Sequence, residues 1–450
     1  GPMKQSFYGG VHPNDRKEAT RHKAVTPLGA APQQVVIAMS MHIGAPCKSV
    51  VAKGDHVTVG QKIGEIAGLG APIHASVSGT VTAVEPRPYP GGNKVMSVVI
   101  ENDFQDTFGS DLTPHPDYSK LTADEIVEII KEAGVTGMGG AGFPTHVKIS
   151  SGIGKVDTLI LNGAECEPYI TADHRLMLEQ GERVIGGARI LMQAFGLQSA
   201  TIGVEANKPD AIEHLQALVG ARADVHVESL RTRYPQGAEK QLIQRLTGRE
   251  VPPGGLPAHV GCAVFNVGTA AAVYDAVVEG KPVTHRIVTV TGDAVKEPCN
   301  LLVPLGTSFQ HLIDEAKGFA EEPDRVLTGG PMMGIAQHTL EVGIIKGTNA
   351  VLCLTRKEAA PIETEEVCLR CARCVNVCPM HLTPVYMHLY AGKGMWKEAE
   401  ALNVMDCIEC GSCNYICPAR LHLVQSFRMT KMELRQLAAK EKAAKEAAKA

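Results

Sequence analysis

Long apolar runs, aromatic side chains and an excess of either charge are all scarce in this sequence of 450 residues. No apolar run reaches the roughly 18–20 residues that a membrane-spanning helix needs. The longest candidate, from Cys262 to Val278, is interrupted by polar residues. The formal net charge of -4, without a large basic patch, argues against nucleic acid as a partner. The sequence also lacks the pattern of a signal peptide at its start, so we expect neither export nor insertion into a membrane.

The cysteines are distributed unevenly along the chain. Eight of the 13 cysteines fall between Cys368 and Cys417, and the other five are scattered without a pairing pattern. A disulfide scaffold would spread its cysteines through a small secreted chain. This distribution instead indicates a reducing compartment and a metal site.

Two copies of one motif, C-x₂-C-x₂-C-x₃-C-P, account for these eight cysteines, and this motif is typical of bacterial 4Fe–4S ferredoxins. In two-cluster ferredoxins the fourth cysteine of each run binds the other cluster. The predicted ligands of one cluster are Cys368, Cys371, Cys374 and Cys417, and those of the other are Cys407, Cys410, Cys413 and Cys378. The alternative is a pair of zinc sites, which usually consist of two C-x₂-C pairs separated by a longer gap.

The region from Val35 to Glu101 is rich in short β signals and predicts a small β sandwich. It resembles the barrel-sandwich fold of lipoyl and biotinyl carrier domains, which present a modifiable lysine at a hairpin tip. The corresponding segment here, 74–79, contains no lysine. We therefore expect a structural module without a swinging arm.

The middle of the chain alternates strand-like and helix-like runs, which predicts an α/β domain with a largely parallel sheet. Thr122 and Glu125 form a capping-box pattern at the first helix. The expected strands are 157–161, 200–205, 224–230 and 262–265, and the expected helices are 209–219, 238–246 and 269–278.

The predicted fold class is therefore α/β and multidomain. The predicted domains are a barrel-sandwich module (3–115), a Rossmann-like α/β domain (116–282), a β-grasp or SLBB-like domain (283–356), an α-helical two-cluster ferredoxin domain (357–430) and an Ala/Lys/Glu-rich tail (431–450). The tail is expected to be a solvated helix or disordered.

A glycine-rich loop between Gly137 and Gly142 contains a G-x-G-x-x-G match. A dinucleotide fingerprint follows a strand, whereas this loop follows a predicted helix, so the ordinary dinucleotide interpretation is disfavoured. A structural turn is the plain alternative. With Lys148 downstream, however, backbone N–H groups and an ammonium could hold a phosphate. The next strand ends before Glu165 and Glu167, whose carboxylates would face the ligand crevice of a parallel sheet or simply lie in a solvated loop.

Four segments occur in the order GMGGAGFPTHVK, NGAECEPYITADHR, RYPQGAEKQLIQRLTG and FNVGTAAAV. Together they resemble the flavoprotein subunit of complex I, which binds FMN and NADH. The GGVHP segment near the start, the sandwich module and the two cysteine runs narrow the match. Over nearly its whole length, the chain resembles the RnfC family, which belongs to the Rnf ion-translocating ferredoxin:NAD oxidoreductase complex.

The resemblance implies a set of residues around each cofactor. The residues implied for FMN are Gly137, Gly139, Gly140, Gly142, Lys148, Asn162, Glu165, Tyr234, Gly237, Glu239, Asn266 and Thr269. Lys148 would meet the phosphate, and Asn162 with Glu165 would contact the flavin or its ribityl chain. Phe143 and Glu167 match positions that hold the nicotinamide of NADH against the flavin, and we regard them as the catalytic pair.

The function implied is electron transfer between NAD(H), FMN and two 4Fe–4S clusters, with ion translocation left to partner subunits. Those partners would be the membrane subunits and the ferredoxin-like RnfB protein of the complex. The chain would bind peripherally at the cytoplasmic face of the bacterial inner membrane. Two alternatives are the cobalamin reductase of bacterial microcompartments, whose flavin domain stands near the N-terminus, and an electron-conducting scaffold without flavin.

Overall fold

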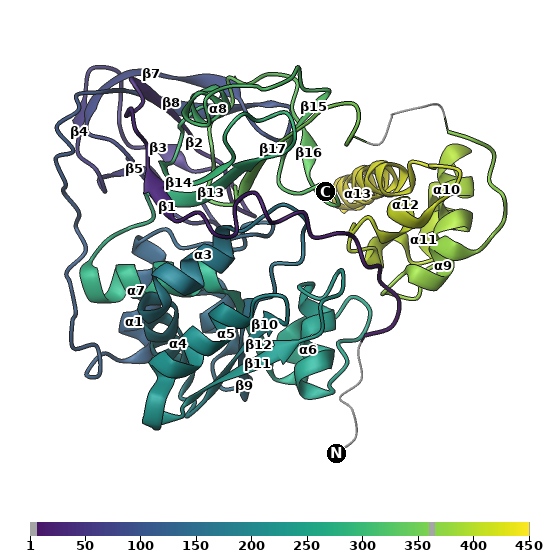
Figure 1. The fold of residues 1–450 in the computed structure, drawn as a ribbon, viewed down its shortest axis with the longest axis horizontal. Helices are drawn as coiled ribbons and strands as arrows, with labels where there is room; N and C mark the ends of the chain where they lie inside the picture. The colour runs from purple at the N-terminus through teal and green to yellow at the C-terminus, as the bar shows by residue number, and fades with distance from the viewer. Residues whose placement is uncertain (1–6, 360–364, 450) are drawn as a thin grey trace. The chain divides into compact units, whose positions relative to one another are not determined.

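The computed structural model describes residues 7–359 and 365–449, which divide into two compact units. The cysteine unit combines the chain up to Asn14, the segment Arg231–Leu256 and the chain from Pro361 onward. The larger unit comprises Asp15–Leu230 and Pro257–Ala360. Figure 1 shows the elements of both units. The α/β multidomain class is confirmed, although the segment Arg231–Leu256 leaves the α/β domain to join the cysteines.

The N-terminal part of the larger unit is the expected β module. One sheet has the order β2-β8-β7-β4 and a smaller one the order β3-β5-β6. The strands are β2 (Gln34–Ala38), β3 (Lys48–Ser49), β4 (His56–Val57), β5 (Lys62–Glu65), β6 (Ile73–His74), β7 (Gly79–Pro88) and β8 (Lys94–Asn102). Alternate residues such as Val35 and Ile37 are fully buried, as expected for strands with one core-facing side.

The α/β part contains a parallel sheet of order β11-β10-β9-β12. Its strands are β9 (Thr158–Gly163), β10 (Ala200–Glu205), β11 (Val225–Leu230) and β12 (Cys262–Asn266). The first strand, β9, has β10 on one side and β12 on the other, and Asn162 pairs with Asn266 where β9 and β12 end. Ligands of open parallel sheets bind at such a switch point, beyond the carboxyl ends of the strands.

Helices cover this sheet, as Figure 1 shows. They are α1 (Ala123–Glu132), α2 (Thr145–Gly152), α3 (Ala172–Glu179), α4 (Gly181–Phe195), α5 (Pro209–Val219) and α7 (Val267–Glu279). Both hydrogen bonds of the Thr122–Glu125 capping box are present at α1. The sequence patterns did not predict α2, α3 or α4. Glycines at 181, 186 and 187 weaken the helical signal of α4, but those at 186 and 187 let α4 approach α7 closely.

A six-stranded sheet of order β1-β14-β13-β17-β15-β16 forms the last part of the larger unit. Its strands are β1 (Val25–Pro27), β13 (His285–Thr291), β14 (Cys299–Pro304), β15 (Arg325–Thr328), β16 (Ile335–Ala336) and β17 (Ala350–Leu354), with helix α8 (Phe309–Glu315). Fully buried Lys346 donates to the carbonyls of Pro72 (2.8 Å) and Gly134 (2.6 Å). This ammonium thus ties together all three parts of the larger unit.

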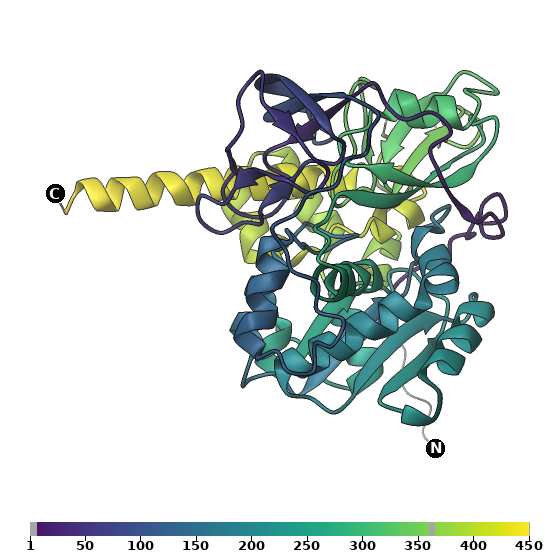
Figure 2. The same cartoon turned by 90° about the vertical axis from the view of Figure 1, so that its left-hand side faces the viewer.

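The cysteine unit is helical. Its helices are α6 (Glu239–Thr247), α9 (Arg373–Val377), α10 (Pro384–Gly392), α11 (Trp396–Ala401), α12 (Ser412–Ile416) and α13 (Leu423–Ala447). A short 3₁₀ turn in this unit spans Val404–Asp406, and two more, Gly220–Arg222 and Pro257–Val260, belong to the larger unit. Figure 2 shows α13 as one long helix at the C-terminal end. The tail predicted from residue 431 is therefore helical through Ala447. Within the described ranges, no helix is both long enough and apolar enough to span a membrane.

We expect Gly187→Ala to destabilise the larger unit, because a Cβ at this position would overlap the backbone carbonyl of Ala270 in α7. Overpacking of this kind costs about 1–3 kcal/mol in the free energy of unfolding. Urea unfolding followed by circular dichroism measures the loss. Gly181→Ala is the matched control in the same helix, since its added methyl would meet only the movable ends of the Leu218 and His214 side chains and no backbone. Equal stability of both variants would contradict the close α4–α7 packing.

Candidate functional site

The glycine loop joins α1 to α2 and is closed at its base. The Gly137 N–H donates to the Phe143 carbonyl (2.9 Å), and the Thr145 N–H donates to the Val135 carbonyl (3.1 Å). Gly139 and Gly142 have φ values of +86° and +77°, which favour glycine. The tip from Gly139 to Ala141 is exposed, and in the described part of the chain its amide groups donate to no other residue. The loop therefore offers a concave run of backbone donors that suits a phosphate or a planar cofactor.

Two residues from β12 and α7 hold this loop in place. The Thr269 hydroxyl accepts from the Met138 N–H (3.0 Å) and donates to the Thr136 carbonyl (3.1 Å). The Asn266 side chain caps α7 by accepting from the Gly268 N–H (2.7 Å). A Cβ at Gly139 would lie 3.3 Å from the Asn266 amide. The structure thus brings the glycines, Asn266 and Thr269 together at the switch point of the sheet.

Asn162 and Lys148 lie beside the same strand ends. Asn162 is opposite Asn266 in the strand register, and its side-chain oxygen accepts from the Ala164 N–H (3.0 Å). The Lys148 ammonium, carried by α2, donates to the Val264 carbonyl and lies 5.0 Å from the centre of the Phe265 ring. Asn162 therefore lies at the carboxyl end of β9, and Lys148 packs against β12.

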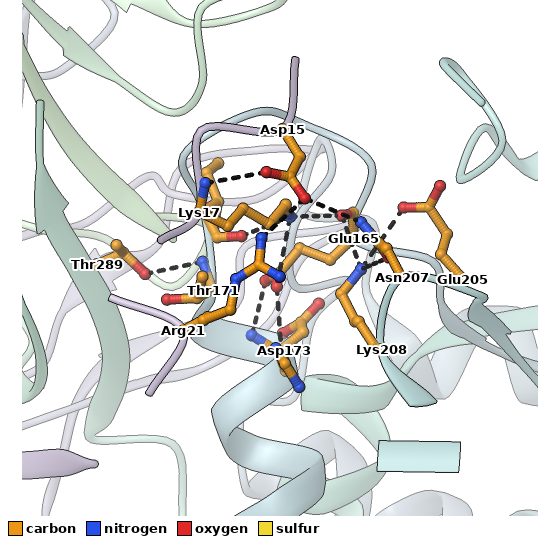
Figure 3. A network of polar contacts seen from close by, with 12 residues as sticks. Asp15, Lys17, Arg21, Glu165, Thr171, Asp173, Glu205, Asn207, Lys208 and Thr289 are labelled. Atoms are coloured by element: carbon orange, nitrogen blue, oxygen red, sulfur yellow. Dashed lines mark hydrogen bonds and ion pairs between the residues drawn. The ribbon is translucent and has the colours of Figure 1, made fainter. Parts of the chain in front are cut away.

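Glu165 is buried at the centre of a polar network, which Figure 3 shows. Its carboxylate accepts from the N–H groups of Asp173 (2.7 Å) and His174 (3.3 Å), at the start of α3. The Lys17 ammonium lies 4.0 Å from this carboxylate and donates to the Glu165 carbonyl (2.8 Å). Lys208 donates to the same carbonyl (3.2 Å) and lies 3.5 Å from Glu205.

Burial dominates the titration of this network. Burial raises the pKa of Glu165 above its ordinary value, although the two lysines oppose the change. Burial and the neighbouring Lys208 ammonium lower the pKa of Lys17. The sequence motifs pointed to Glu165 but to neither lysine, because Glu165, which both lysines contact, lies far from each of them in the sequence.

Glu167 binds the last part of the larger unit, which contains the six-stranded sheet. Its carboxylate accepts from the N–H groups of Met332 and Met333, both at 2.9 Å. A Cβ at Gly330 would lie 2.5 Å from this carboxylate, which explains the glycine there. Burial raises the pKa of Glu167 to about 7. Glu167 therefore fixes the loop between β15 and β16, whatever else it contacts.

Arg286 is a further residue beside the glycine loop that sequence reasoning missed. It is buried, donates to the Thr348 carbonyl (3.3 Å) and lies 3.3 Å from the Met138 sulfur. Burial lowers its pKa, while the carboxylates of Asp173 and Glu165 act in the opposite direction. Arg286 and Asp173 also line a cavity of about 580 Å³. No motif marks Arg286, since it lies in β13 among ordinary strand residues.

Three residues implied for FMN lie in the cysteine unit instead. Tyr234 is buried and its hydroxyl donates to the Cys410 carbonyl. Glu239 begins α6, and Gly237 lies just before this helix. The structure therefore does not bring these three together with the glycine loop inside one unit.

The cysteines of the two runs interleave. Cys378 lines one cavity together with Cys407, Cys410 and Cys413. Cys374 interacts electrostatically with Cys371 and Cys417. Cys378 thus lies with three cysteines of the second run and Cys417 with two of the first, and the two crossed ligand sets stay a prediction.

The backbone around three of the cysteines also suits clusters. Backbone N–H groups donate to the sulfurs of Cys368 (3.4 Å), Cys378 (3.4 Å) and Cys407 (3.3 Å). Such hydrogen bonds to sulfur are one means by which proteins tune iron–sulfur clusters.

Comparison with family models assigns four consecutive regions. Residues 5–105 match the RnfC barrel sandwich hybrid domain, and residues 130–275 match the Nuo51 FMN-binding domain. Residues 287–336 match the SLBB domain, and residues 360–418 match a 4Fe-4S dicluster domain. The last match decides between the two interpretations of the cysteine runs in favour of 4Fe–4S clusters over zinc.

Curated relatives match almost the whole chain. It is 50% identical over 433 residues to the C subunit of the Na(+)-translocating ferredoxin:NAD(+) oxidoreductase complex of Acetobacterium woodii, covering 95% of this chain and 97% of the relative. It is 47% identical over 445 residues to the C subunit of the proton-translocating ferredoxin:NAD(+) oxidoreductase complex of Clostridium ljungdahlii, covering 98% and 96%.

A solved structure supports the fold alone. The air-oxidized NAD+-reducing [NiFe]-hydrogenase has a chain that is 20% identical, with a TM-score of 0.50. The similarity covers 71% of this chain and 65% of that one.

Thr269→Val should weaken FMN binding about tenfold, because it leaves the Met138 N–H without its acceptor and frees the loop; an unsatisfied buried donor costs about 1–3 kcal/mol. Quenching of flavin fluorescence during titration of the apoprotein measures the affinity. Thr269→Ser retains the hydroxyl and is expected to bind FMN as the wild type does. Unchanged affinity in the valine variant would show that the loop needs no anchor.

Glu167 should make stability depend on pH. The folded-state pKa of about 7 lies above the ordinary value of 4.5, so the folded protein holds the extra proton between these values. The stabilisation is therefore full below pH 4.5 and is lost as pH rises through 7, with a slope of at most about 1.4 kcal/mol per pH unit.

The comparison is between wild type and Glu167→Gln, by urea unfolding at intervals from pH 4.5 to 8. The difference in unfolding free energy between the two proteins should change across this window and be constant above it. A constant difference throughout would rule out a protonated Glu167 at neutral pH.

Proposed function

The chain belongs to the RnfC family of ferredoxin:NAD(+) oxidoreductase complexes, and on this premise we propose the roles that its residues play in moving electrons between NAD(H), FMN and two 4Fe–4S clusters. The observation that carries the function is the near-complete match to two relatives that hold the same place in such complexes. The FMN-binding and dicluster domains stand in one chain.

The bound cofactors supply the redox chemistry: flavin exchanges hydride with nicotinamide and single electrons with iron–sulfur clusters. The protein supplies binding and orientation. We propose that the exposed amides of Gly139, Gly140 and Ala141 hold FMN, and that Thr269 and Asn266 fix their position. Arg286 contributes a buried positive charge beside the loop, which favours an anionic cofactor.

Lys148, Asn162 and Glu165 complete the proposed FMN contacts at the strand ends. Tyr234, Gly237 and Glu239 keep their assignment from the resemblance, as a proposal. Phe143 would face the nicotinamide ring. Glu167 would hold the loop between β15 and β16 close to that ring, through the hydrogen bonds that its carboxylate accepts from the N–H groups of Met332 and Met333. The eight cysteines would bind the two clusters in the crossed sets given above.

The partners are the other subunits of the complex, which carry out ion transport. The two relatives are named for different ions, Na(+) and protons, so we assign neither ion to this chain. We place the chain peripherally at the cytoplasmic face of the bacterial inner membrane, where NADH is available.

The two alternatives receive less support. A cobalamin reductase would have its flavin domain near the N-terminus, whereas residues 5–105 here match the barrel sandwich module. A flavin-free scaffold does not account for a glycine loop that hydrogen bonds close at its base while its tip stays exposed.

The decisive experiment is an anaerobic titration of the purified protein with NADH, following flavin absorbance and the electron paramagnetic resonance (EPR) of the clusters. Bleaching of bound flavin followed by cluster signals supports the proposal. Intact clusters that NADH leaves oxidised, in a protein that retains FMN, would refute NADH oxidation by this chain.

Phe143→Leu should slow flavin reduction by NADH about tenfold in a stopped-flow measurement, since misplacing the nicotinamide is costly. FMN content should be unchanged, because only the Phe143 backbone carbonyl closes the loop. Phe195→Leu is a control in the same unit, outside the loop. Equal rates for wild type and Phe143→Leu would remove Phe143 from the catalytic pair.

A further inference from the structure

The two cysteine runs have the same motif but very different surroundings. In the first run Cys371 is exposed, and its neighbours Val367 and Leu369 are 86% and 67% exposed. In the second run Cys410 and Cys413 are each only 8% exposed, and Ser412 between them is fully buried. Exposed apolar side chains beside a cofactor are typical of surfaces that meet another protein.

A segment at the start of the chain covers Cys378, the first-run cysteine that lies with the second run. We call residues Phe7–Val11 the N-terminal strap. The Gly10 N–H donates to the Val377 carbonyl (2.7 Å), and the Tyr8 ring stacks on His381 at 4.2 Å. A Cβ at Gly9 would lie 2.6 Å from the Val377 carbonyl oxygen, so only glycine permits this approach.

The strap is itself bound to the segment that carries Tyr234. Val11 and Tyr234 exchange two backbone hydrogen bonds, of 2.9 and 3.0 Å. The Arg233 guanidinium lies 4.7 Å from the centre of the Phe7 ring and donates to the Phe7 carbonyl (2.8 Å). Tyr234 is 2% exposed, and its hydroxyl donates to the Cys410 carbonyl.

The C-terminal helix α13 contacts the loop around Cys407. The Lys431 ammonium, in α13, is buried and donates to the Cys407 carbonyl and to Glu409 (2.9 Å). Arg428 also donates to Glu409 (2.8 Å). The loops of Cys378, Cys407 and Cys410 are thus each fastened by an element outside the two motifs.

We propose that the two clusters have different tasks. The cluster of Cys407, Cys410, Cys413 and Cys378 is an enclosed relay, and Tyr234 with the N-terminal strap positions it. The cluster of Cys368, Cys371, Cys374 and Cys417 is the one that exchanges electrons with an external redox protein, at the surface around Val367 and Leu369. This inference rests on the proposed function only in requiring that both clusters bind.

Tyr234 is a positioning residue: its hydroxyl donates to the backbone of Cys410, and its effect on the cluster would pass through that backbone. Removing its hydroxyl takes one hydrogen bond from the Cys410 carbonyl and loosens the ligand loop, which changes the hydrogen bonding and solvation that set a cluster's potential. The effect should be confined to one cluster, since the carbonyl to which the Tyr234 hydroxyl donates belongs to the second run.

The test is an EPR redox titration of the full-length protein, reduced with dithionite so that neither NADH nor flavin is needed. Cys371→Ser identifies the signal of the exposed cluster. A soluble dysprosium chelate, as the probe of exposure, should enhance the relaxation of that signal and leave the other nearly unaffected.

Tyr234→Phe should shift the midpoint potential of the other signal only, and Tyr8→Leu, at a half-exposed ring of the strap, should shift the same one. Tyr415→Phe is the matched control, because Tyr415 lies in α12 of the second run but is 51% exposed. Both cluster midpoint potentials of the Tyr415→Phe variant should equal those of the wild type.

Two results would overturn the inference: equal dysprosium effects on both signals, or a Tyr234→Phe shift that is absent or falls on the Cys371-dependent signal. Failure of the proposed function looks different. In that case NADH reduces neither cluster, while dithionite still reduces both with unequal dysprosium effects. A protein that binds no cluster after anaerobic reconstitution would overturn both.

Discussion

The burial of one carboxylate, that of Glu165, organises the larger unit. A charged group out of water must find partners in the protein. Glu165 has the first N–H groups of α3 and the ammonium of Lys17, while Lys208 donates to its carbonyl. These contacts fasten the N-terminal segment, the chain after β9 and the start of α3 to one another.

The same constraint extends to the glycine loop through neighbouring residues. Asp173, whose N–H binds Glu165, accepts from the Asn266 side chain (3.0 Å). Asn266 caps α7, and Thr269 in the first turn of α7 holds the loop on both sides of Gly137. The loop can therefore keep its tip exposed and its amides available, because its rigidity comes from buried neighbours and not from its own glycines.

Local patterns predicted those features that depend on nearby residues. The capping box at Thr122, strand β10 and helix α5 all follow from short-range spacing. Lys17, Lys208 and Arg286 could not be found in this way, since each acquires its meaning from partners more than 40 residues away. Helix α4 was missed because its glycines serve packing against α7 and not helix propensity.

Local patterns also could not predict the unequal surroundings of the two cysteine runs. The motifs are identical, so burial is decided by the strap and by Arg231–Leu256, which are distant in the sequence. That segment leaves the α/β sheet after β11 and returns to it before β12. The element that fastens Cys410 is therefore covalently part of the α/β domain at both of its ends. A fragment containing only the two motifs would lack Tyr234 and the strap, so the domain that the sequence pattern delimits is smaller than the unit that folds around the enclosed site.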